Sequence, residues 1–455
     1  MTRKIIVPAR IARIRGLSLI ELMIGITLGM LVVAALLALY LNITTTNNEM
    51  SKMNRQIENG RFAIQLLQED IIHAGYWGTY VPNFDDLTAR NIPIDTPDEL
   101  PDPCLAYSAT DWTTDYTKNL IGIPVQADLG SCGVVGSQQD DTDVLVVRHA
   151  QTCVAGAGGN CDADTAGKMY FQSTRCAAEV SGPAQAGSPT TITLSANASS
   201  TDDFYVGAVI RIINGPGNVS TGEKFSTITD YDGTTKIATV NPPWTTAPDN
   251  SSVYAFGHGY VLSDQAFIFS SMDCATPADK RKFVSNIYYV RNFANTSGDG
   301  IPTLMRSSFD LAGGTLSHQP ATALIEGIEG FRVEYGIDDK SDSGADVNNS
   351  VGIVWADPDN YVSPTNRGDG IPDKWVDEAG VTCTGPGIGQ CDAANVVAVK
   401  IHVLARNERA TPGYVDSKTY QLGDLTMGPF NDGFKRHVFS STARLANPSG
   451  RRETP

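Results

Sequence analysis

The chain has 455 residues, with 50 Asp and Glu against 34 Lys and Arg, and a formal net charge of −16 at pH 7. Phosphate binding needs a basic face, so this composition excludes nucleic acid as an expected partner. Glycine (43) and proline (24) are frequent and only 8% of the residues are aromatic, which predicts a loop-rich protein that can still bury a core.

The first two segments are a basic leader and an apolar stretch. Residues 1–16 contain five basic residues and no acid, and residues 17–41 contain one charged residue, Glu21. As a helix, the second segment would be about 37 Å long, enough to cross a hydrocarbon layer of about 30 Å. The basic leader favours the cytoplasmic side, so the rest of the chain is expected across the membrane.

Glu21 is an unusual residue for a membrane segment. An ionised carboxylate in lipid costs about 3 kcal/mol and persists only with a partner. No basic residue or histidine lies between Leu17 and Leu41. Cleavage after Gly16 would create a new α-amino group on Leu17, one helical turn before Glu21. We expect that amine, in the same subunit or in a neighbouring one, to be the partner.

At these residues the chain resembles a type IV prepilin: Gly16, then Leu17, then Ser18-Leu19-Ile20-Glu21-Leu22. The resemblance implies that a prepilin peptidase cleaves after Gly16 and methylates the amine of Leu17. It also implies that Glu21 helps to dock subunits into a filament. Leu17 replaces the usual phenylalanine. The alternative is a plain signal-anchor helix that contains one acid.

A second resemblance follows the membrane segment. Residues 54–78 are similar to the PilW family of minor pilins, mainly in Glu58-Asn59-Gly60-Arg61-Phe62-Ala63 and in residues 70–76, and shorter similarities occur in residues 329–338 and 396–406. The family implies pilus assembly, cell adhesion and twitching motility. Its implied partners are other minor pilins, the major pilin, the prepilin peptidase and the inner-membrane assembly platform, and a large tip-associated adhesin is a further candidate.

The helix is predicted to continue beyond the membrane. No proline lies between Pro8 and Pro82, and apolar or small residues recur at three- and four-residue spacing, which predicts an amphipathic continuation over residues 42–75 that closes at Gly75. The weak helix formers of residues 42–48 predict local loosening. Gly25 and Gly29 have the small-xxx-small spacing that allows a second helix to approach closely in lipid.

Residues 76–455 are predicted to form a periplasmic or extracellular head rich in β-strands. Apolar runs bounded by turn residues predict strands at residues 143–149, 205–213, 283–291, 331–335 and 396–405. The fold class is therefore α+β and pilin-like: a long N-terminal helix packed on a mainly antiparallel sheet with long loop insertions. The length predicts insertions or two lobes. His149 and His402 are predicted to lie on a sheet surface.

Eight cysteines, all after residue 100, indicate an oxidising compartment and a disulfide framework. Eight cysteines allow 105 pairings, so the sequence leaves the connectivity open. Cys153 with Cys161 and Cys383 with Cys391 are each eight residues apart and suggest local loop closures, and Cys104 with Cys132 could close a longer loop. Beyond these, Cys176 with Cys274 is a weak preference. Thiolate metal binding is the alternative, but no C-x-x-C pair supports it.

The pentapeptide Gly-Asp-Gly-Ile-Pro occurs at residues 298–302 and again at 368–372. In the second copy, Asp369 and Asp373 around a tight turn are candidate calcium ligands, with Asp338, Asp339, Asp357 and Asp359 expected nearby. Arg367 stands where an EF-hand would place an acidic residue or asparagine. A solvated acidic turn is the alternative.

No catalytic motif occurs: G-x-S-x-G, P-loop and H-E-x-x-H patterns are absent from the sequence, and the six histidines show no metal-like pair. We therefore expect no enzyme, no catalytic residue and no cofactor other than the candidate calcium. The predicted function is that of a minor pilin in the inner membrane and then at the pilus tip, where it primes assembly. The alternatives are a type II secretion pseudopilin and a tip adhesin with an enlarged ligand-binding head.

Overall fold

The computed structural model describes residues 18–86, 93, 95–127, 132–159, 161–173, 181–206, 208–218, 225–256, 260–265, 267, 269–271, 276–354 and 365–453. The chain divides into two compact units, residues 1–55 and 56–455, which are described separately below.

Helix α1 (Leu19–His73) begins in the first unit and ends in the second. The predicted loosening at residues 42–48 is wrong, because the helix is unbroken there. The hydroxyls of Thr44 and Thr45 donate to the carbonyls of Tyr40 and Leu41, both at 2.8 Å, so these side chains bond within the helix instead of competing with it. As predicted, the left-handed residue after the helix is Gly75, with φ +72°.

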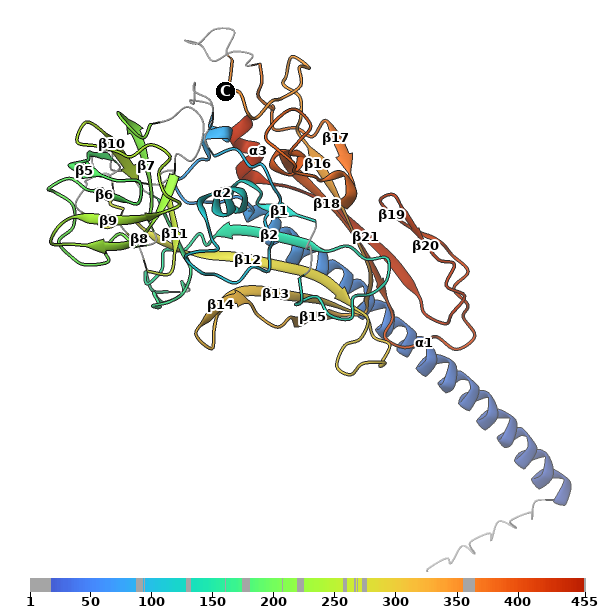
Figure 1. The fold of residues 1–455 in the computed structure, drawn as a ribbon. Helices are drawn as coiled ribbons and strands as arrows, with labels where there is room; N and C mark the ends of the chain where they lie inside the picture. The colour runs from blue at the N-terminus through green and yellow to red at the C-terminus, as the bar shows by residue number, and fades with distance from the viewer. Residues whose placement is uncertain are drawn as a thin grey trace, which may run out of the picture. The chain divides into compact units, whose positions relative to one another are not determined.

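Within its described residues, the head contains three larger antiparallel sheets and one hairpin (Figure 1). The first sheet has eight strands: β1 (Val125–Gln126), β2 (Leu145–Ala150), β3 (Tyr170–Ser173), β11 (Tyr260–Ser263), β12 (Lys280–Arg291), β13 (Thr303–Ala312), β14 (Thr315–His318) and β15 (Thr322–Glu326). The second sheet has four strands in the order β17 (Lys374–Val376), β16 (Ile328–Ile337), β18 (Val396–Arg406) and β21 (Arg436–Arg444). The hairpin pairs β19 (Tyr420–Leu422) with β20 (Leu425–Met427).

The main core forms where both of these sheets pack against the head part of α1. It contains buried side chains from α1, from β2, β12 and β13 of the first sheet, and from β16, β18 and β21 of the second. In β16, Phe331, Val333 and Tyr335 are buried while Arg332 and Glu334 are only partly covered, as the alternation predicted. The α+β class of a long helix on mainly antiparallel sheets is confirmed.

A separate lobe is inserted between the paired strands β3 and β11. Its seven strands are β4 (Ser181–Pro183), β5 (Ala186–Gly187), β6 (Thr191–Thr193), β7 (Val209–Asn214), β8 (Phe225–Asp232), β9 (Ile237–Asn241) and β10 (Val253–Phe256). Strands β4 and β5 are the two edge strands of this sheet, and only two residues separate them in the chain. The sheet therefore closes on itself around a core of its own. The lobe is one of the insertions that the length of the head suggested.

Short helices complete the head: η1 (Asn83–Asp85), α2 (Thr114–Gly122), η2 (Glu378–Gly380), η3 (Asp392–Asn395) and α3 (Ala446–Arg452). Two local predictions are wrong. Strand β7 begins at Val209, because residues 201–206 form turns. His149 and His402 are buried, each 8% exposed, because a carboxylate accompanies each ring: Asp70 lies 3.0 Å from His149 and Glu334 lies 2.8 Å from His402.

Candidate functional site

The first unit presents the apolar half of α1. Its large apolar side chains are exposed, among them Leu19, Met30 and Leu41. Among the described residues, α1 is long and apolar enough to cross a membrane, by length and composition, and none of its apolar window is buried within the chain. An apolar surface of this extent requires lipid or an apolar partner to cover it.

Glu21 lies in the first turn of this half and forms a reciprocal cap with Ser18. Its Oε2 accepts hydrogen bonds from the backbone N–H (3.0 Å) and the hydroxyl (3.1 Å) of Ser18, and its own N–H donates to that hydroxyl (3.3 Å). Gly16 and Leu17 lie outside the described residues. Cleavage, methylation and pairing of Glu21 with the Leu17 amine therefore stay predictions.

Gly25 and Gly29 leave an open strip on the same half. A Cβ atom at either position would meet no heavy atom within 4 Å. Between them, the hydroxyl of Thr27 donates to the carbonyl of Met23 at 2.9 Å, so it is satisfied within the helix. The strip is free for the backbone of a second helix, and the predicted packing role stays a prediction.

The head part of α1 is shaped for close contact. Gly60, Ala63, Leu67 and Ile71 are buried and follow helical spacing. A Cβ atom on Gly60 would lie 2.1 Å from Cε2 of Phe439 in β21. Glycine is therefore the residue that lets this ring rest directly on the helix backbone.

Three side-chain amides fasten the same part of α1 to both sheets. They are Gln56, which donates to the Ala405 carbonyl (2.7 Å), Asn59, which donates to the Glu326 carbonyl (3.0 Å), and Gln68, which donates to the Ser441 hydroxyl (2.6 Å). These contacts were not predicted from the sequence. A signal was present, because Gln56 lies on the same helical stripe as Gly60 and Leu67.

Asp70 of α1 contacts three side chains of the first sheet. Its Oδ2 accepts hydrogen bonds from Asn286 and from the hydroxyl of Tyr288, both at 2.9 Å, and its Oδ1 lies 3.0 Å from Nε2 of His149. Burial opposes ionisation of this carboxyl, but the hydrogen bonds and the neighbouring imidazole outweigh it and lower its pKa. The carboxylate thus ties α1 to β2 and β12.

The end of α1 is held by the C-terminal helix α3. Gly75 donates its N–H to the Arg148 carbonyl (3.0 Å), and its own carbonyl accepts a hydrogen bond from Arg451. Asn447 donates to the Ala74 carbonyl at 3.1 Å. These contacts satisfy carbonyls that the end of a helix leaves open.

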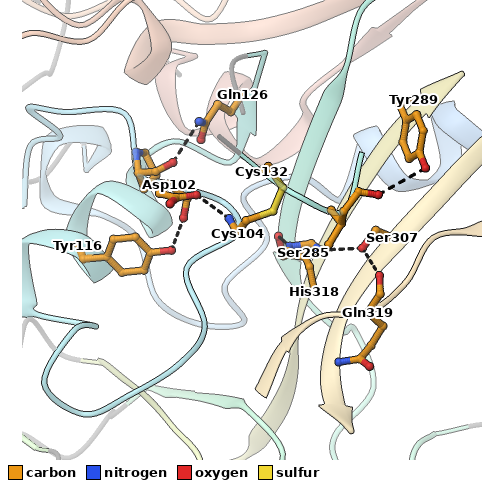
Figure 2. Close-up of a disulfide and its surroundings, with 12 residues drawn as sticks. Asp102, Cys104, Tyr116, Gln126, Cys132, Ser285, Tyr289, Ser307, His318 and Gln319 are labelled. Atoms are coloured by element: carbon orange, nitrogen blue, oxygen red, sulfur yellow. Dashed lines mark hydrogen bonds between the residues drawn. A yellow bond between two sulfur atoms is a disulfide. The ribbon is translucent and has the colours of Figure 1, made fainter. Parts of the chain in front are cut away.

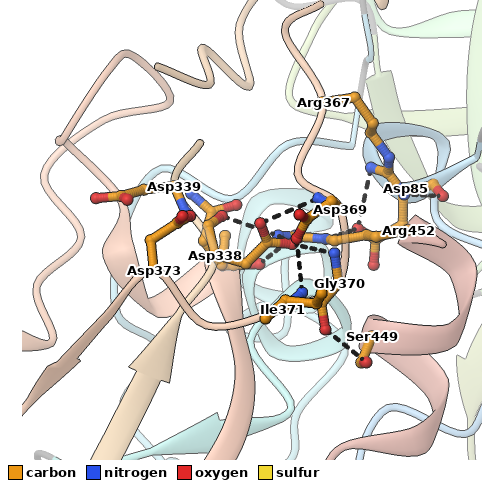
Figure 3. Close-up of polar contacts among 12 residues, drawn as sticks. Asp85, Asp338, Asp339, Arg367, Asp369, Gly370, Ile371, Asp373, Ser449 and Arg452 are labelled. Carbon is orange, nitrogen blue, oxygen red and sulfur yellow. Dashed lines mark hydrogen bonds and ion pairs between the residues drawn. The ribbon is translucent and has the colours of Figure 1, made fainter. Parts of the chain in front are cut away.

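A cluster of buried charged residues lies beside α3, as Figure 3 shows for Asp85, Arg367 and Arg452. The guanidinium of Arg452 donates to Asp85 (3.0 Å) and to Asp338 (3.3 Å), and Arg367 donates to the Phe84 carbonyl (2.6 Å) and to Asp85 (3.3 Å). Burial raises the pKa of Asp85, but its arginine neighbours outweigh this effect and lower it overall. Burial prevails at Asp338, whose pKa is raised in spite of Arg452. The cluster binds the chain end to the loop after α1.

The candidate calcium loop lies at the edge of this cluster. Asp373 accepts the N–H groups of Asp339 (3.1 Å) and Lys340 (2.8 Å), and Asp369 accepts the N–H of Ile371 (2.8 Å). The described residues contain no group of three His, Cys, Asp or Glu side chains suited to a metal ion. Residues 357 and 359 lie outside the described part of the chain. The calcium site of Asp369 and Asp373 and its alternative, a solvated acidic turn, both stay predictions.

The structure contains disulfides between Cys104 and Cys132, between Cys153 and Cys161, and between Cys383 and Cys391. Figure 2 shows the first of these, where Asp102 accepts the N–H of Cys104 at 2.8 Å. Cys176 and Cys274 lie outside the described residues. These three pairs are among those that the sequence spacing suggested.

Residues 287–447 match a family model described as Type IV Pilus-assembly protein W, PilW. The matched segment runs from β12 to α3 and includes the whole four-stranded sheet that packs on α1. The inserted lobe lies outside it. No curated protein and no solved structure matches the chain.

Proposed function

We propose that this chain, which matches the PilW family of type IV pilus-assembly proteins over residues 287–447, takes part in pilus assembly as a minor pilin. In this role the apolar half of α1 anchors the protein in the inner membrane and later packs in the filament. The head is carried on the other part of the same helix.

The observation that supports this role is the division of α1 into two differently covered parts. Its first part exposes apolar side chains almost without interruption, and its second part is buried against both sheets. A helix of this kind can pass from lipid to a bundle of similar helices while its head stays folded. The basic leader favours a cytoplasmic N-terminus and a periplasmic head.

We further propose that the prepilin peptidase cleaves after Gly16 and methylates Leu17, and that Glu21 then pairs with a terminal amine during docking. The proposed partners are other minor pilins, the major pilin and the inner-membrane assembly platform, with a large tip-associated adhesin as a further candidate. Together with other minor pilins, the protein would prime assembly and remain at the pilus tip.

Deletion of the coding sequence in the source bacterium tests the proposal. We expect surface pili, counted by electron microscopy, to be lost or strongly reduced and to return with the wild-type copy. Antibodies to the head should label pilus ends in the complemented strain. Normal pili together with a loss of secreted enzymes would contradict the proposal and indicate a pseudopilin of a type II secretion system.

A further inference from the structure

Strand β21 leaves one edge of the four-stranded sheet open. It pairs with β18 on one side, and no strand among the described residues pairs with its other side. The opposite edge of the same sheet is β17, which has only three residues, whereas β21 has nine. A long open edge presents a row of unpaired N–H and C=O groups to which another strand can bind.

The pairing with β18 determines which main-chain groups of β21 point outward. Lys435 and Leu445, which flank β21, form main-chain hydrogen bonds of 3.0 and 2.9 Å with residues in or next to β18. Hydrogen-bonded pairs alternate along an antiparallel ladder, so the odd-numbered residues of β21 bond to β18 and the even-numbered residues direct their N–H and C=O outward. No described residue bonds to these outward groups in the middle of the strand, at Val438, Ser440 and Thr442.

The edge of β21 also lacks the features that usually block an open strand. Bulges, prolines and charged side chains are the common ones. The register between β18 and β21 runs over nine residue pairs without a shift. Residues 437–443 contain no proline and no Asp, Glu, Lys or Arg. The edge can therefore accept a further strand.

Helix α1 provides an apolar surface beside this edge. Side chains of β21 contact α1 at Gly60 and Gln68. Ile57 and Ile72 lie on the same side of the helix, three residues before Gly60 and four after Gln68, and they are 38% and 45% exposed. Alternate side chains of an added strand would cover these two isoleucines and remove apolar surface from water.

Charge indicates which kind of strand fits. Arg61 is exposed four residues after Ile57 and forms no ion pair with a described residue, so it favours an acidic residue in the added strand. A second copy of β21 fits poorly. In a symmetric antiparallel pair centred on Ser440, Arg436 of one copy would face Arg444 of the other, and like charges directly opposite destabilise a sheet.

We propose that β21 accepts an extended strand from the head of another minor pilin, which becomes the fifth strand of this sheet. The inference rests on the proposed role as a minor pilin and assigns the surface through which the head contacts its neighbour. Main-chain hydrogen bonds along the edge supply the attraction. The two isoleucines and Arg61 select the partner through the side chains of its strand.

Amide hydrogen exchange resolved to single residues tests the proposal. The full-length protein in detergent is compared alone and in complex with each of the other minor pilins of the source bacterium in turn. We expect the outward amides of Val438, Ser440 and Thr442 to exchange fast in the free protein and to become protected about tenfold or more in one complex. The amides of Phe439 and Ser441, which already bond to β18, are the internal control and should change much less.

A matched pair of variants tests the same edge by affinity. Thr442→Pro removes one outward N–H and leaves the hydrogen bonds to β18 in place, since proline is tolerated on an edge strand. It should weaken binding of the minor pilin about tenfold. Thr442→Val keeps the N–H and should bind as the wild type does. Melting temperatures show whether both variants are folded, and the exchange measurement on the wild type does not depend on them.

Three results would overturn the proposal: a complex in which the three outward amides stay unprotected, equal binding by the folded Thr442→Pro and Thr442→Val variants, or no binding to any of the minor pilins. Protection of the outward amides in the protein alone as its concentration rises would identify a second copy as the occupant and would overturn it too. If deletion abolishes pili and yet these amides stay unprotected in every complex, the assembly role stands and only the added strand is wrong.

Discussion

The two parts of α1 belong to one continuous helix but differ in what covers their side chains. The first part, residues 19–41, carries large apolar side chains that the described chain leaves exposed, and Glu21 there bonds to Ser18. The second part, residues 56–73, buries small, large apolar and polar side chains under two sheets. The first part needs a covering that the chain does not provide, whereas the second is covered by its own head.

This difference identifies which substitutions should act on the folding of the head and which should act on assembly. Polar side chains of the second part form hydrogen bonds with the sheets, so replacing one of them leaves a buried donor or acceptor without its partner. Residues of the first part contact few other side chains. Substitutions there should change processing or docking and leave the head folded.

The two carboxylates of α1 give the largest contrast. Asp70→Ala would leave the buried donors of His149, Asn286 and Tyr288 without their acceptor and should lower the free energy of unfolding of the head by about 3 kcal/mol. Glu21→Ala should leave head stability unchanged but reduce incorporation with partner pilins. Thermal melting and co-purification measure the two effects. Normal incorporation of Glu21→Ala would remove its docking role.

The glycines provide a matched pair with a smaller effect. Gly60→Ala would place a Cβ atom 2.1 Å from Phe439 and should cost the head about 1–3 kcal/mol through overpacking. Gly25→Ala, which meets no atom within 4 Å, is the control and should not change the melting temperature of the head. Equal melting temperatures for both variants would show that the ring of Phe439 moves away without cost.

Low pH should lower the stability of the head through protonation of Asp70. Its pKa is lower in the folded state than the usual 3.8, so the carboxylate stabilises the head above that value. This contribution is lost as the pH falls through the folded-state pKa. In chemical denaturation from pH 5 downward, the wild type should therefore lose more stability below about pH 4 than Asp70→Asn does. Parallel profiles would contradict the assigned role of Asp70.

The smallest effect concerns the loop that contains Asp369 and Asp373. Both carboxylates already accept hydrogen bonds from backbone N–H groups: Asp369 from its own loop and Asp373 from a neighbouring loop. This is the usual arrangement of a carboxylate in a turn. In protein stripped with chelator, we expect the same melting temperature with millimolar calcium as with magnesium. A calcium-specific increase that Asp369→Ala abolishes would establish a metal site instead.

Structural features that follow from a local residue pattern could be predicted from the sequence. Features that depend on contacts between residues far apart in the chain could not. Hydrophobic periodicity predicted the extent of α1 and the alternation in β16, because both repeat over many residues. His149 was assigned to a surface because its partner Asp70 is 79 positions away in the chain. From the sequence, Arg367 is only a departure from the EF-hand pattern. Its contact with Asp85 depends on tertiary packing that no local pattern encodes.

Intact-mass measurement of the protein extracted from membranes tests the central proposal most directly. A minor pilin from cells with an active prepilin peptidase should have the mass of residues 17–455 with one added methyl group at Leu17. Gly16→Val should retain the full mass of the uncut chain. A wild-type mass that includes residues 1–16 in such cells would contradict the assignment as a processed pilin.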